Sequence, residues 1–591
     1  MPIGSPKPAL AKRVDTMHKY LTTTAVSFVL AASPALADET DIDQILYGVQ
    51  NALNAVYAAD GGVDIDQTAT NAGNIISRGP DSLDDIYQSA RGVGQTATNY
   101  VNSTDGLYDP EGPFDGFENV TQAATNVLNS LSMDSGASVE TIRQRARFTD
   151  QEAANAVFYD GDSINIDQTA INAANLVNAP TTELTEDVSQ RMRGGSQLAT
   201  NDAIGDDYFD DLDDVVQSAT NVANSVSAMD VDDVRQSIRG SDQRAINTIE
   251  VYDDLRVTDL DLNVQEAVNA ANLISITGDG DDLRQRSVFS EQVAYNMILG
   301  PDVYPGNPDH GDVVEDVAQT ATNVTNSVSG GEGGTIIDTI GQRSLFLVQR
   351  AGNLVDMGDS ITGLTQDATN AANIAQFNDL GVGTFGGARQ WWSGGYQTAT
   401  NVVAFGLGDA AVYDLAQAAT NVINSLSGDD INDSAPGGTG VAVSQVVDMS
   451  GLSGQLAGNF VSFGSEDGDG LTDVTQAATN AANLITLDEL RGVTVQDAYV
   501  QQVAGNVAVP NLASFFIAGS GDIVNLDQSA VNAVNVISAN ELPDILGATD
   551  ISQTASGFQL STNIAATTAS VSGVTQAATN VANSIGMPSD S

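Results

Sequence analysis

The sequence DVTQAATNAANLITL occupies residues 473–487, and the close variant GVTQAATNVANSIGM occupies residues 573–587. Neither contains a strong base or nucleophile, and both are built around Gln, Ala, Thr and Asn. The phrase Q-x-A-x-N-x-x-N occurs twelve times, and the shorter Q-x-A-x-N starts at nine further glutamines. A degenerate copy, with Ser561 in place of Ala, starts at Gln559. These 22 copies indicate an array of structural repeats rather than a compositional bias.

The copies are arranged in pairs. From Gln122 onward the full phrases recur every 46 to 59 residues, usually with a weaker copy between them. Each half-unit averages roughly 25 residues, which is the size of one coil of a solenoid. The weaker copies often carry a second Gln seven residues earlier, as Gln88 precedes Gln95 and Gln236 precedes Gln243. Arginines cluster in the same half-units: Arg91, Arg143, Arg145, Arg147, Arg191, Arg193, Arg235, Arg239, Arg244, Arg284, Arg286 and Arg343.

The phrase fits a β-strand. An apolar residue two positions before the Gln shares one face with the Gln, the Ala and the first Asn. The other face carries small or β-branched residues, often Thr. The second Asn then falls at a corner, where Asn tolerates left-handed backbone geometry.

A helical repeat array is the alternative. In DLAQAATNVINSL (residues 414–426) apolar residues lie at helical spacing, and Asp414 with Gln417 imitates a capping box. However, Asn, Thr, Ser and Val are mediocre helix formers, and a half-unit leaves little room for paired helices. We therefore predict an all-β fold, a β-solenoid of about 22 coils in paired repeats of roughly 50 residues.

Stacking explains why the repeat is built from Gln, Ala and Asn. Coils about 4.8 Å apart place each Gln over the next Gln and each Asn over the next Asn, and 22 coils form a rod of roughly 100 Å. The buried amides then hydrogen-bond as ladders, which removes the penalty of desolvating them. The predicted ladder residues are Gln67, Asn71, Asn74, Gln122, Asn126, Asn129, Gln217, Asn221, Asn224, Gln417, Asn421, Asn424, Gln476, Asn480, Asn483, Gln576, Asn580 and Asn583.

The N-terminus has the organisation of a secretory signal peptide. A stretch with three lysines and one arginine precedes the apolar run LTTTAVSFVLAASPALA, which ends in Ala35-Leu36-Ala37. We expect cleavage after residue 37, leaving residues 38–591 as a single repeat array that is secreted. No later stretch is long and apolar enough to span a membrane.

Composition argues against an enzyme. The chain has no Cys, and its two histidines are His18 and His310. No P-loop, dinucleotide fingerprint or nucleophile elbow is present, so no catalytic residue, cofactor site or set of metal ligands is assigned. A carboxylate site between coils that cleaves acidic polysaccharides is the remaining enzymatic alternative. With 77 acidic and 21 basic residues the net charge is −56, which disfavours nucleic acid as a partner.

Two features suggest ligands without establishing them. Acidic segments at residues 205–214, 278–282 and 465–470 are interpreted as solvated turns, with weak Ca²⁺ binding as the alternative. Four phrases carry a T-x-T pair, which is typical of ice-binding solenoids but also suits any strand. These pairs are Thr68/Thr70, Thr96/Thr98, Thr320/Thr322 and Thr398/Thr400.

Repeated Gln and Asn at fixed spacing in a Cys-free chain resembles the curlin-type subunits of bacterial amyloid fibres and the related proteins that anchor holdfast adhesins. Here Ala replaces Gly after the Gln, Asn comes one position sooner and a second Asn is added. The resemblance implies a β-solenoid, export across the outer membrane of a Gram-negative bacterium, and a structural or adhesive role at the cell surface.

The regular last repeat independently predicts an uncapped end that docks another copy or a partner. We expect self-assembly end to end, or anchoring of an adhesin through an outer-membrane secretion or anchoring system. Divalent cations are expected to control assembly by screening the charge. The alternative is a monomeric rod-like adhesin or a solenoid that binds calcium, polysaccharide or ice.

Overall fold

The structure is a computed structural model. It describes residues 41–586 except 59–61, 79–82, 104–116, 134–137, 160–162, 206–210, 252–258, 262, 301–312, 331–336, 357–359, 378–386, 405–410, 431–442, 452, 464–469, 490–493, 511–520, 542–550 and 568. Every regular element in these residues is a β-strand, in a single 26-stranded arrangement. The predicted all-β repeat fold is therefore confirmed, and the helical alternative is unsupported.

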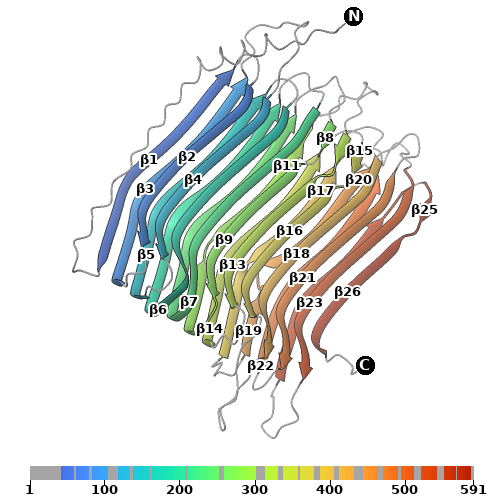
Figure 1. Cartoon of the computed structure of the whole chain (residues 1–591). Coiled ribbons are helices and arrows are strands. Elements are labelled where there is room, and N and C mark those ends of the chain that lie inside the picture. Colours follow the sequence, from blue (N-terminus) through green and yellow to red (C-terminus); the bar gives the residue numbers. More distant parts are fainter. Residues whose placement is uncertain are drawn as a thin grey trace, which may run out of the picture.

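The strands form two parallel stacks that face each other, here called the A stack and the B stack (Figure 1). The A stack comprises β1 (Ile42–Ala58), β3 (Leu83–Ser103), β5 (Ser138–Tyr159), β10 (Gly280–Val288), β11 (Glu291–Leu299), β14 (Ile337–Asp356), β17 (Gly387–Ala404), β19 (Val443–Asp448), β20 (Gly454–Phe463), β22 (Thr494–Pro510), β24 (Ile551–Ala565) and the second halves of β6 (Ser163–Gly205) and β7 (Asp211–Val251). The B stack comprises β2 (Gly62–Arg78), β4 (Phe117–Met133), the first halves of β6 and β7, β8 (Asp259–Asp261), β9 (Val264–Ile276), β12 (Val313–Glu315), β13 (Ala318–Gly330), β15 (Ser360–Thr362), β16 (Thr365–Phe377), β18 (Ala411–Asp430), β21 (Leu471–Glu489), β23 (Ile523–Glu541), β25 (Val571–Ser572) and β26 (Thr575–Gly586).

The stacking unit is the pair of half-units. Gln67 aligns with Gln122, and Gln50 aligns with Gln95, so consecutive phrases alternate between the two stacks. This corrects the expectation that each Gln stacks on the Gln of the next phrase, because it stacks on the Gln of the next phrase but one. The described phrases form eleven two-armed coils. At about 4.8 Å per coil the rod is roughly 50 Å long, half the predicted length.

Burial alternates along each arm, as a strand with one face in the core requires. In β4 the buried positions include Val120, Gln122, Ala124 and Asn126, whereas Thr121 faces solvent. The same positions repeat on every coil, so the core consists of columns. Alanines stacked coil upon coil run along the centre of the rod, and a cluster of larger apolar side chains lies towards each edge. Small alanine side chains allow the two stacks to approach closely.

The second Asn of the phrase lies at a corner, as predicted. All eleven of these asparagines in the B stack have φ between 52° and 58°, from Asn74 in the first coil to Asn583 in the last. Asn adopts this left-handed region at lower cost than most residues, because its short amide bonds locally. The corner then redirects the chain without ending the stacking.

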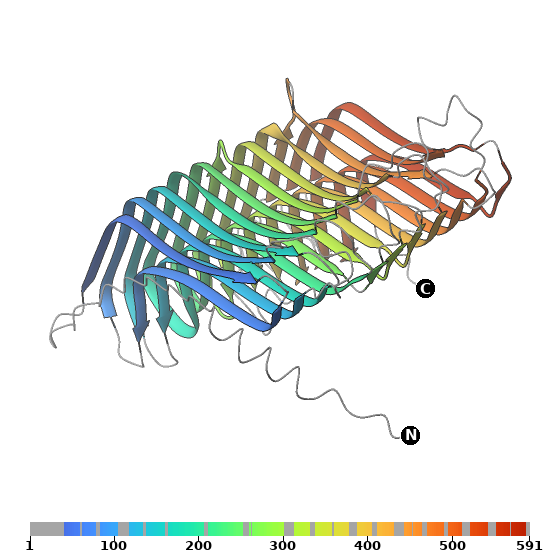
Figure 2. The same cartoon turned by 90° about the horizontal axis from the view of Figure 1, so that it is seen from above.

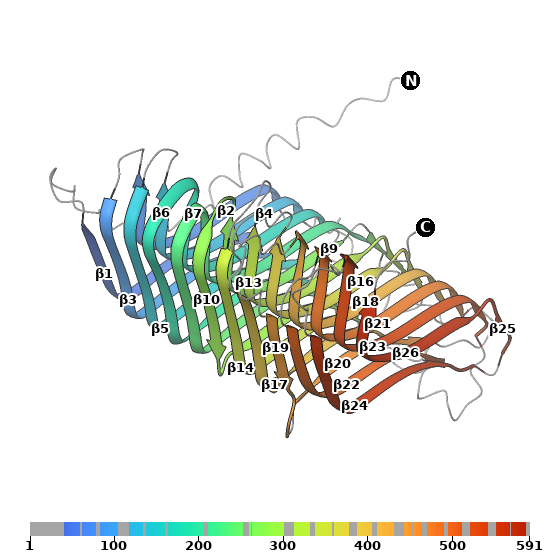
Figure 3. The ribbon, with the colours of Figure 1, turned by 90° about the horizontal axis from the view of Figure 1, so that it is seen from below.

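The rod is elongated, with the first described strand, β1, at one end and the last, β26, at the other (Figures 2 and 3). Coils are added in sequence order from β1 and β2 to β24 and β26, so every coil contacts only its neighbours along the axis. Among the described residues no helix is long and apolar enough to cross a membrane.

Candidate functional site: the amide ladders and the open ends

Six ladders of side-chain amides run the length of the rod, three of Gln and three of Asn. In the B stack they begin at Gln67, Asn71 and Asn74, with bonds of 2.6–2.9 Å between successive coils. In the A stack two ladders begin at Gln50 and Asn54. Each ladder links all eleven coils.

A third A-stack ladder begins at Gln44 and includes Gln88 and Gln236. This second Gln is not among the predicted ladder residues. The missed signal was its recurrence in every weaker half-unit. Its distance from the Gln of the following phrase varies from six to ten residues, because the segment between the two glutamines, here called the arc, differs in length.

All eighteen predicted ladder residues lie in the three ladders of the B stack. Those inside the rod are buried, for example Asn221 and Gln217, each with none of its surface exposed. The Asn221 Nδ2 also donates to the Arg244 carbonyl of the facing stack. The amides are therefore satisfied in two directions, along the rod and across it. Because an unsatisfied buried amide costs about 1–3 kcal/mol, the ladders select this register over any other.

The ladders have opposite polarity. In every Gln ladder the Nε2 donates to the Oε1 of the preceding coil, as Gln122 donates to Gln67 at 2.9 Å. In every Asn ladder the Nδ2 donates to the Oδ1 of the following coil, as Asn71 donates to Asn126 at 2.9 Å. The two ends of the rod consequently present different groups.

Both ends of the rod are open in the part of the chain that the structure describes. β1 and β2 each have one strand partner, β3 and β4, and β24 and β26 pair only with β22 and β23. Exposure changes within one coil at the C-terminal end. Ala530 in β23 is fully buried, whereas Ala578 directly above it in β26 is exposed.

The open ends are complementary. Within the described residues, the first coil offers Gln Nε2 donors and Asn Oδ1 acceptors with no ladder partner before them, and the last coil offers Gln Oε1 acceptors and Asn Nδ2 groups with no ladder partner after them. The Asn563 Nδ2 also donates to the carbonyls of Gln528 and Ala577. A second copy placed head to tail would therefore continue all six ladders. Two like ends would oppose donors to donors.

The arcs at the ends also match. Gln44 and Gln50 are six residues apart in the first coil, and Gln553 and Gln559 are six apart in the last. The arc glycines of these two coils, Gly48 and Gly557, have similar φ of 106° and 112°; in the interior, Gly92 has 59° and Gly195 has 114°. The first coil consequently stacks on β3 with a register shift after Leu46, but has the same arc as β24.

Comparison of the chain with protein-family models, with curated proteins and with solved structures gave no match.

The other candidate sites are placed as follows. His18, His310, the predicted signal peptide, half of the acidic segment 205–214 and all but one residue of the acidic segment 465–470 lie outside the described residues. In the third, residues 278–282, the Asp279 amide donates to the Asp230 carboxylate in a turn. In the described part of the chain no group of three or more His, Cys, Asp or Glu side chains is arranged to hold a metal ion. The two T-x-T pairs of the B stack, Thr68/Thr70 and Thr320/Thr322, do not lie on adjacent coils. On the coil before Thr320 and Thr322, the aligned residues are Glu266 and Val268.

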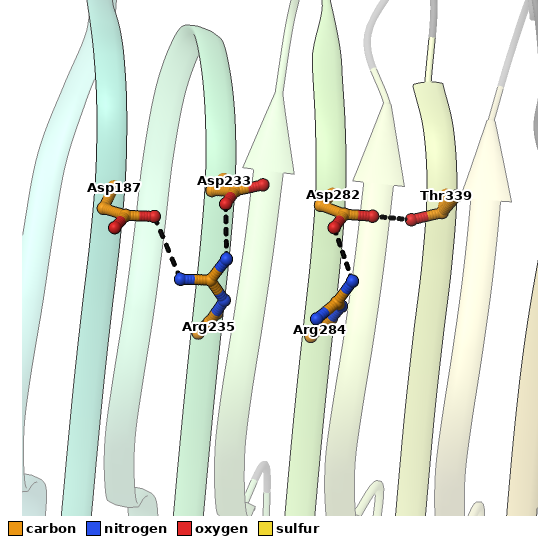
Figure 4. A network of polar contacts seen from close by, with 6 residues as sticks. All are labelled: Asp187, Asp233, Arg235, Asp282, Arg284 and Thr339. Carbon is orange, nitrogen blue, oxygen red and sulfur yellow. Dashed lines mark hydrogen bonds and ion pairs between the residues drawn. The ribbon is translucent and has the colours of Figure 1, made fainter.

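Charged side chains cluster on the outer face of the A stack (Figure 4). Arg235 contacts Asp187 at 3.1 Å and Asp233 at 2.5 Å, and Arg284 contacts Asp282 at 2.5 Å. The hydroxyl of Thr339 donates to the Asp282 carboxylate. Desolvation raises the pKa of Asp233, although the Arg235 guanidinium opposes this shift. These exposed pairs each contribute at most about 1 kcal/mol.

Proposed function

We propose that the protein is a secreted structural protein of the bacterial cell surface that assembles end to end into fibres. The observation that carries this proposal is the complementarity of the two open ends in amide polarity and arc geometry. A monomeric solenoid normally has atypical, polar terminal repeats that cap it. Here the last described coil repeats the interior pattern, and its strand edges are free to pair.

The proposed junction has a defined register. Continuing the A stack places Gln553 beneath Gln44, Gln559 beneath Gln50 and Asn563 beneath Asn54. Val49 and Phe558 are 73% and 55% exposed in the separate protein, and this register makes them neighbours. Burial of these side chains adds a hydrophobic contribution of roughly 25 cal/mol per Å² of apolar surface removed from water.

Charge sets the conditions under which copies join. Two copies with a formal charge of −56 each repel one another over the Debye length, about 8–10 Å at physiological ionic strength. We infer that divalent cations or salt promote assembly by screening this repulsion. The same surface role includes the anchoring of an adhesin, with an outer-membrane secretion or anchoring system as the partner.

Negative-stain electron microscopy of the purified protein, with and without calcium, tests the proposal. Fibres with the width of one solenoid are expected, in greater number with calcium. Isolated rods of about 50 Å would instead favour a monomeric rod-like adhesin. Fibres whose number is unaffected by calcium and salt would contradict the control by charge and retain the assembly.

A further inference from the structure

An array of arginines covers part of the outer face of the A stack. Three columns of outward-facing positions cross seven consecutive coils, from β3 to β17. The first, second and third columns lie one residue before, one residue after and three residues after the A-stack Gln ladder that begins at Gln44. They contain twelve arginines among 21 positions, with no acidic residue. The array arginines are Arg91, Arg143, Arg145, Arg147, Arg191, Arg193, Arg235, Arg239, Arg284, Arg286, Arg343 and Arg389. At about 4.8 Å per coil and 6.6 Å per alternate residue, the array measures roughly 29 by 13 Å.

Ion pairing within the protein does not explain this arrangement, although Arg145, Arg147 and Arg343 lie over the rings of Tyr87, Phe148 and Trp391. Like charges directly opposite each other in a sheet are destabilising, yet Arg147, Arg193 and Arg239 lie on three successive coils. Of the array, Arg235 and Arg284 in the first column pair with aspartates (Figure 4). The arginines of the second and third columns make no ion pair with another described residue. Of these arginines all are exposed except Arg343, which is partly buried.

Aromatic rings border the array at a strained position. At the arc that follows the third column, several coils have Gly at positive φ, but three have Phe148, Phe289 and Phe346, with φ of 50–51°. A non-Gly residue there costs about 1–2 kcal/mol. These rings are 53–55% exposed, so burial does not repay that strain. Phe289 and Phe346 stack with centroids 4.8 Å apart.

We propose that the arginine array, together with Phe148, Phe289 and Phe346 at its border, forms a binding site for a linear polysaccharide that carries carboxylates. Arginine presents a planar fork that binds carboxylates bidentately. The exposed edges of these rings add an apolar surface beside the arginines, against which sugar rings can pack. The array runs along the rod axis, which suits an extended chain rather than a compact ligand. This site is independent of the open ends and of the assembly proposed for them.

Charge distinguishes the polysaccharide from the other polyanions. Duplex DNA carries one charge per about 1.7 Å, so it meets the strongest long-range repulsion from a protein of this net charge. A second copy of the chain has a formal charge of −56 and is likewise repelled. A carboxylated polysaccharide has a lower charge density and reaches the array with less repulsion.

Binding of sodium polygalacturonate to the immobilised protein at low salt tests the site, with the methyl-esterified polymer and duplex DNA as comparison probes. Arg191→Gln/Arg193→Gln is expected to weaken binding about tenfold or more, because charged hydrogen bonds are lost. Arg244→Gln/Arg350→Gln removes the same charge from the same stack outside the array and should change affinity by less than about twofold. Arg350 already pairs with Glu291 at 3.1 Å.

Phe289→Gly/Phe346→Gly separates binding from structure. If the rings serve the ligand, this variant binds the polymer more weakly while its thermal midpoint is unchanged or higher, since strain is relieved. Unchanged binding with a lower midpoint would overturn the role of the rings. Equal effects of the two arginine pairs, equal binding of the methyl ester, tighter binding of DNA, or absence of binding to polygalacturonate would each overturn the site.

Discussion

The side-chain amide of Asn221 donates to the amide oxygen of Asn269 at 2.9 Å, across 48 residues of sequence. Asn221 in turn accepts from Asn172 at 2.9 Å, so it is one step of a ladder with both neighbours in place. The pair shows how a polar residue with no exposed surface is accommodated in a core of alanines.

Asn221→Leu is expected to lower the free energy of unfolding by at least about 2 kcal/mol. It leaves the Asn269 Oδ1 and the Arg244 carbonyl without their donor, and each unsatisfied buried group costs about 1–3 kcal/mol. The control is Thr220→Val on the outer face of the same strand, between Ile171 and Val268, which should be near neutral. Chemical denaturation of both variants measures the difference, and equal stabilities would contradict a stabilising role for the ladder.

Ala578→Lys is expected to prevent end-to-end assembly and to leave the thermal midpoint of the separate protein unchanged. Ala578 is exposed at the open end, but a second copy would bury it against its own Ala69 column, where an unpaired charge is strongly unfavourable. Ala577→Lys adds the same charge to the outer face of the same strand and should still assemble. Fibre formation is followed by light scattering and electron microscopy. If both variants assembled equally, the end of β26 would not be the junction.

A disulfide reports the register of the junction, because the chain has no Cys of its own. When Val49→Cys protein is mixed with Phe558→Cys protein and oxidised, covalent dimers are expected. The two Cα atoms would be about 4.8 Å apart, which is within the range of a disulfide. Val49→Cys mixed with Leu560→Cys is the control, since that pair is displaced by two residues, beyond about 7 Å. Equal crosslinking of both mixtures on a denaturing gel would refute the register.

Asn424→Ala is expected to be more destabilising than Asn424→Gly. Both substitutions remove the ladder bonds to Asn373 and Asn483, so the difference between them isolates the backbone. Asn424 has a φ of 56°, where Ala is strained by about 1–2 kcal/mol and Gly is not. The usual preference for Ala over Gly is therefore reversed. Thermal melts of the two variants check the order.

Stability is expected to rise as the pH is lowered from 7 towards about 4. Desolvation raises the pKa of Asp202, Asp232, Asp233 and Asp242 in the folded protein. A carboxyl whose pKa is raised by folding binds its proton more tightly in the folded state. Stability is therefore gained as pH falls through the folded pKa, and the gain is complete below the ordinary value.

Asp202→Asn tests this pH dependence at the most buried of these carboxyls. The amide retains an acceptor for Thr248 and removes the charge, so the thermal midpoint at pH 7 should rise and its increase on acidification should shrink. Asp150→Asn, at a carboxyl exposed on the same stack, is the control and should preserve the increase. A midpoint that falls steadily from pH 7 to 5 in the unmodified protein would contradict the assigned sign.

The strand, the ladders of the B stack and the corner asparagine could be predicted from single phrases. Gln, Ala and Asn at alternate positions define one face of a strand, and Asn221 needs only the local phrase to be placed in the core. The difference between the six-residue arc from Gln44 to Gln50 and the seven-residue arc from Gln88 to Gln95 could not be interpreted from the sequence. An arc changes which residues face the core without changing the residue types.

The sequence by itself determined that the chain forms stacked β-coils with buried amides, since side-chain periodicity and amide desolvation act within one repeat. Only the tertiary structure decided which phrases stack. Adjacent half-units have nearly the same core pattern, so the choice depends on how two arms close around a common core. That choice halved the length of the rod. It also brought Arg147 and Arg193, 46 residues apart, onto neighbouring coils, because stacking aligns positions one full coil apart in sequence.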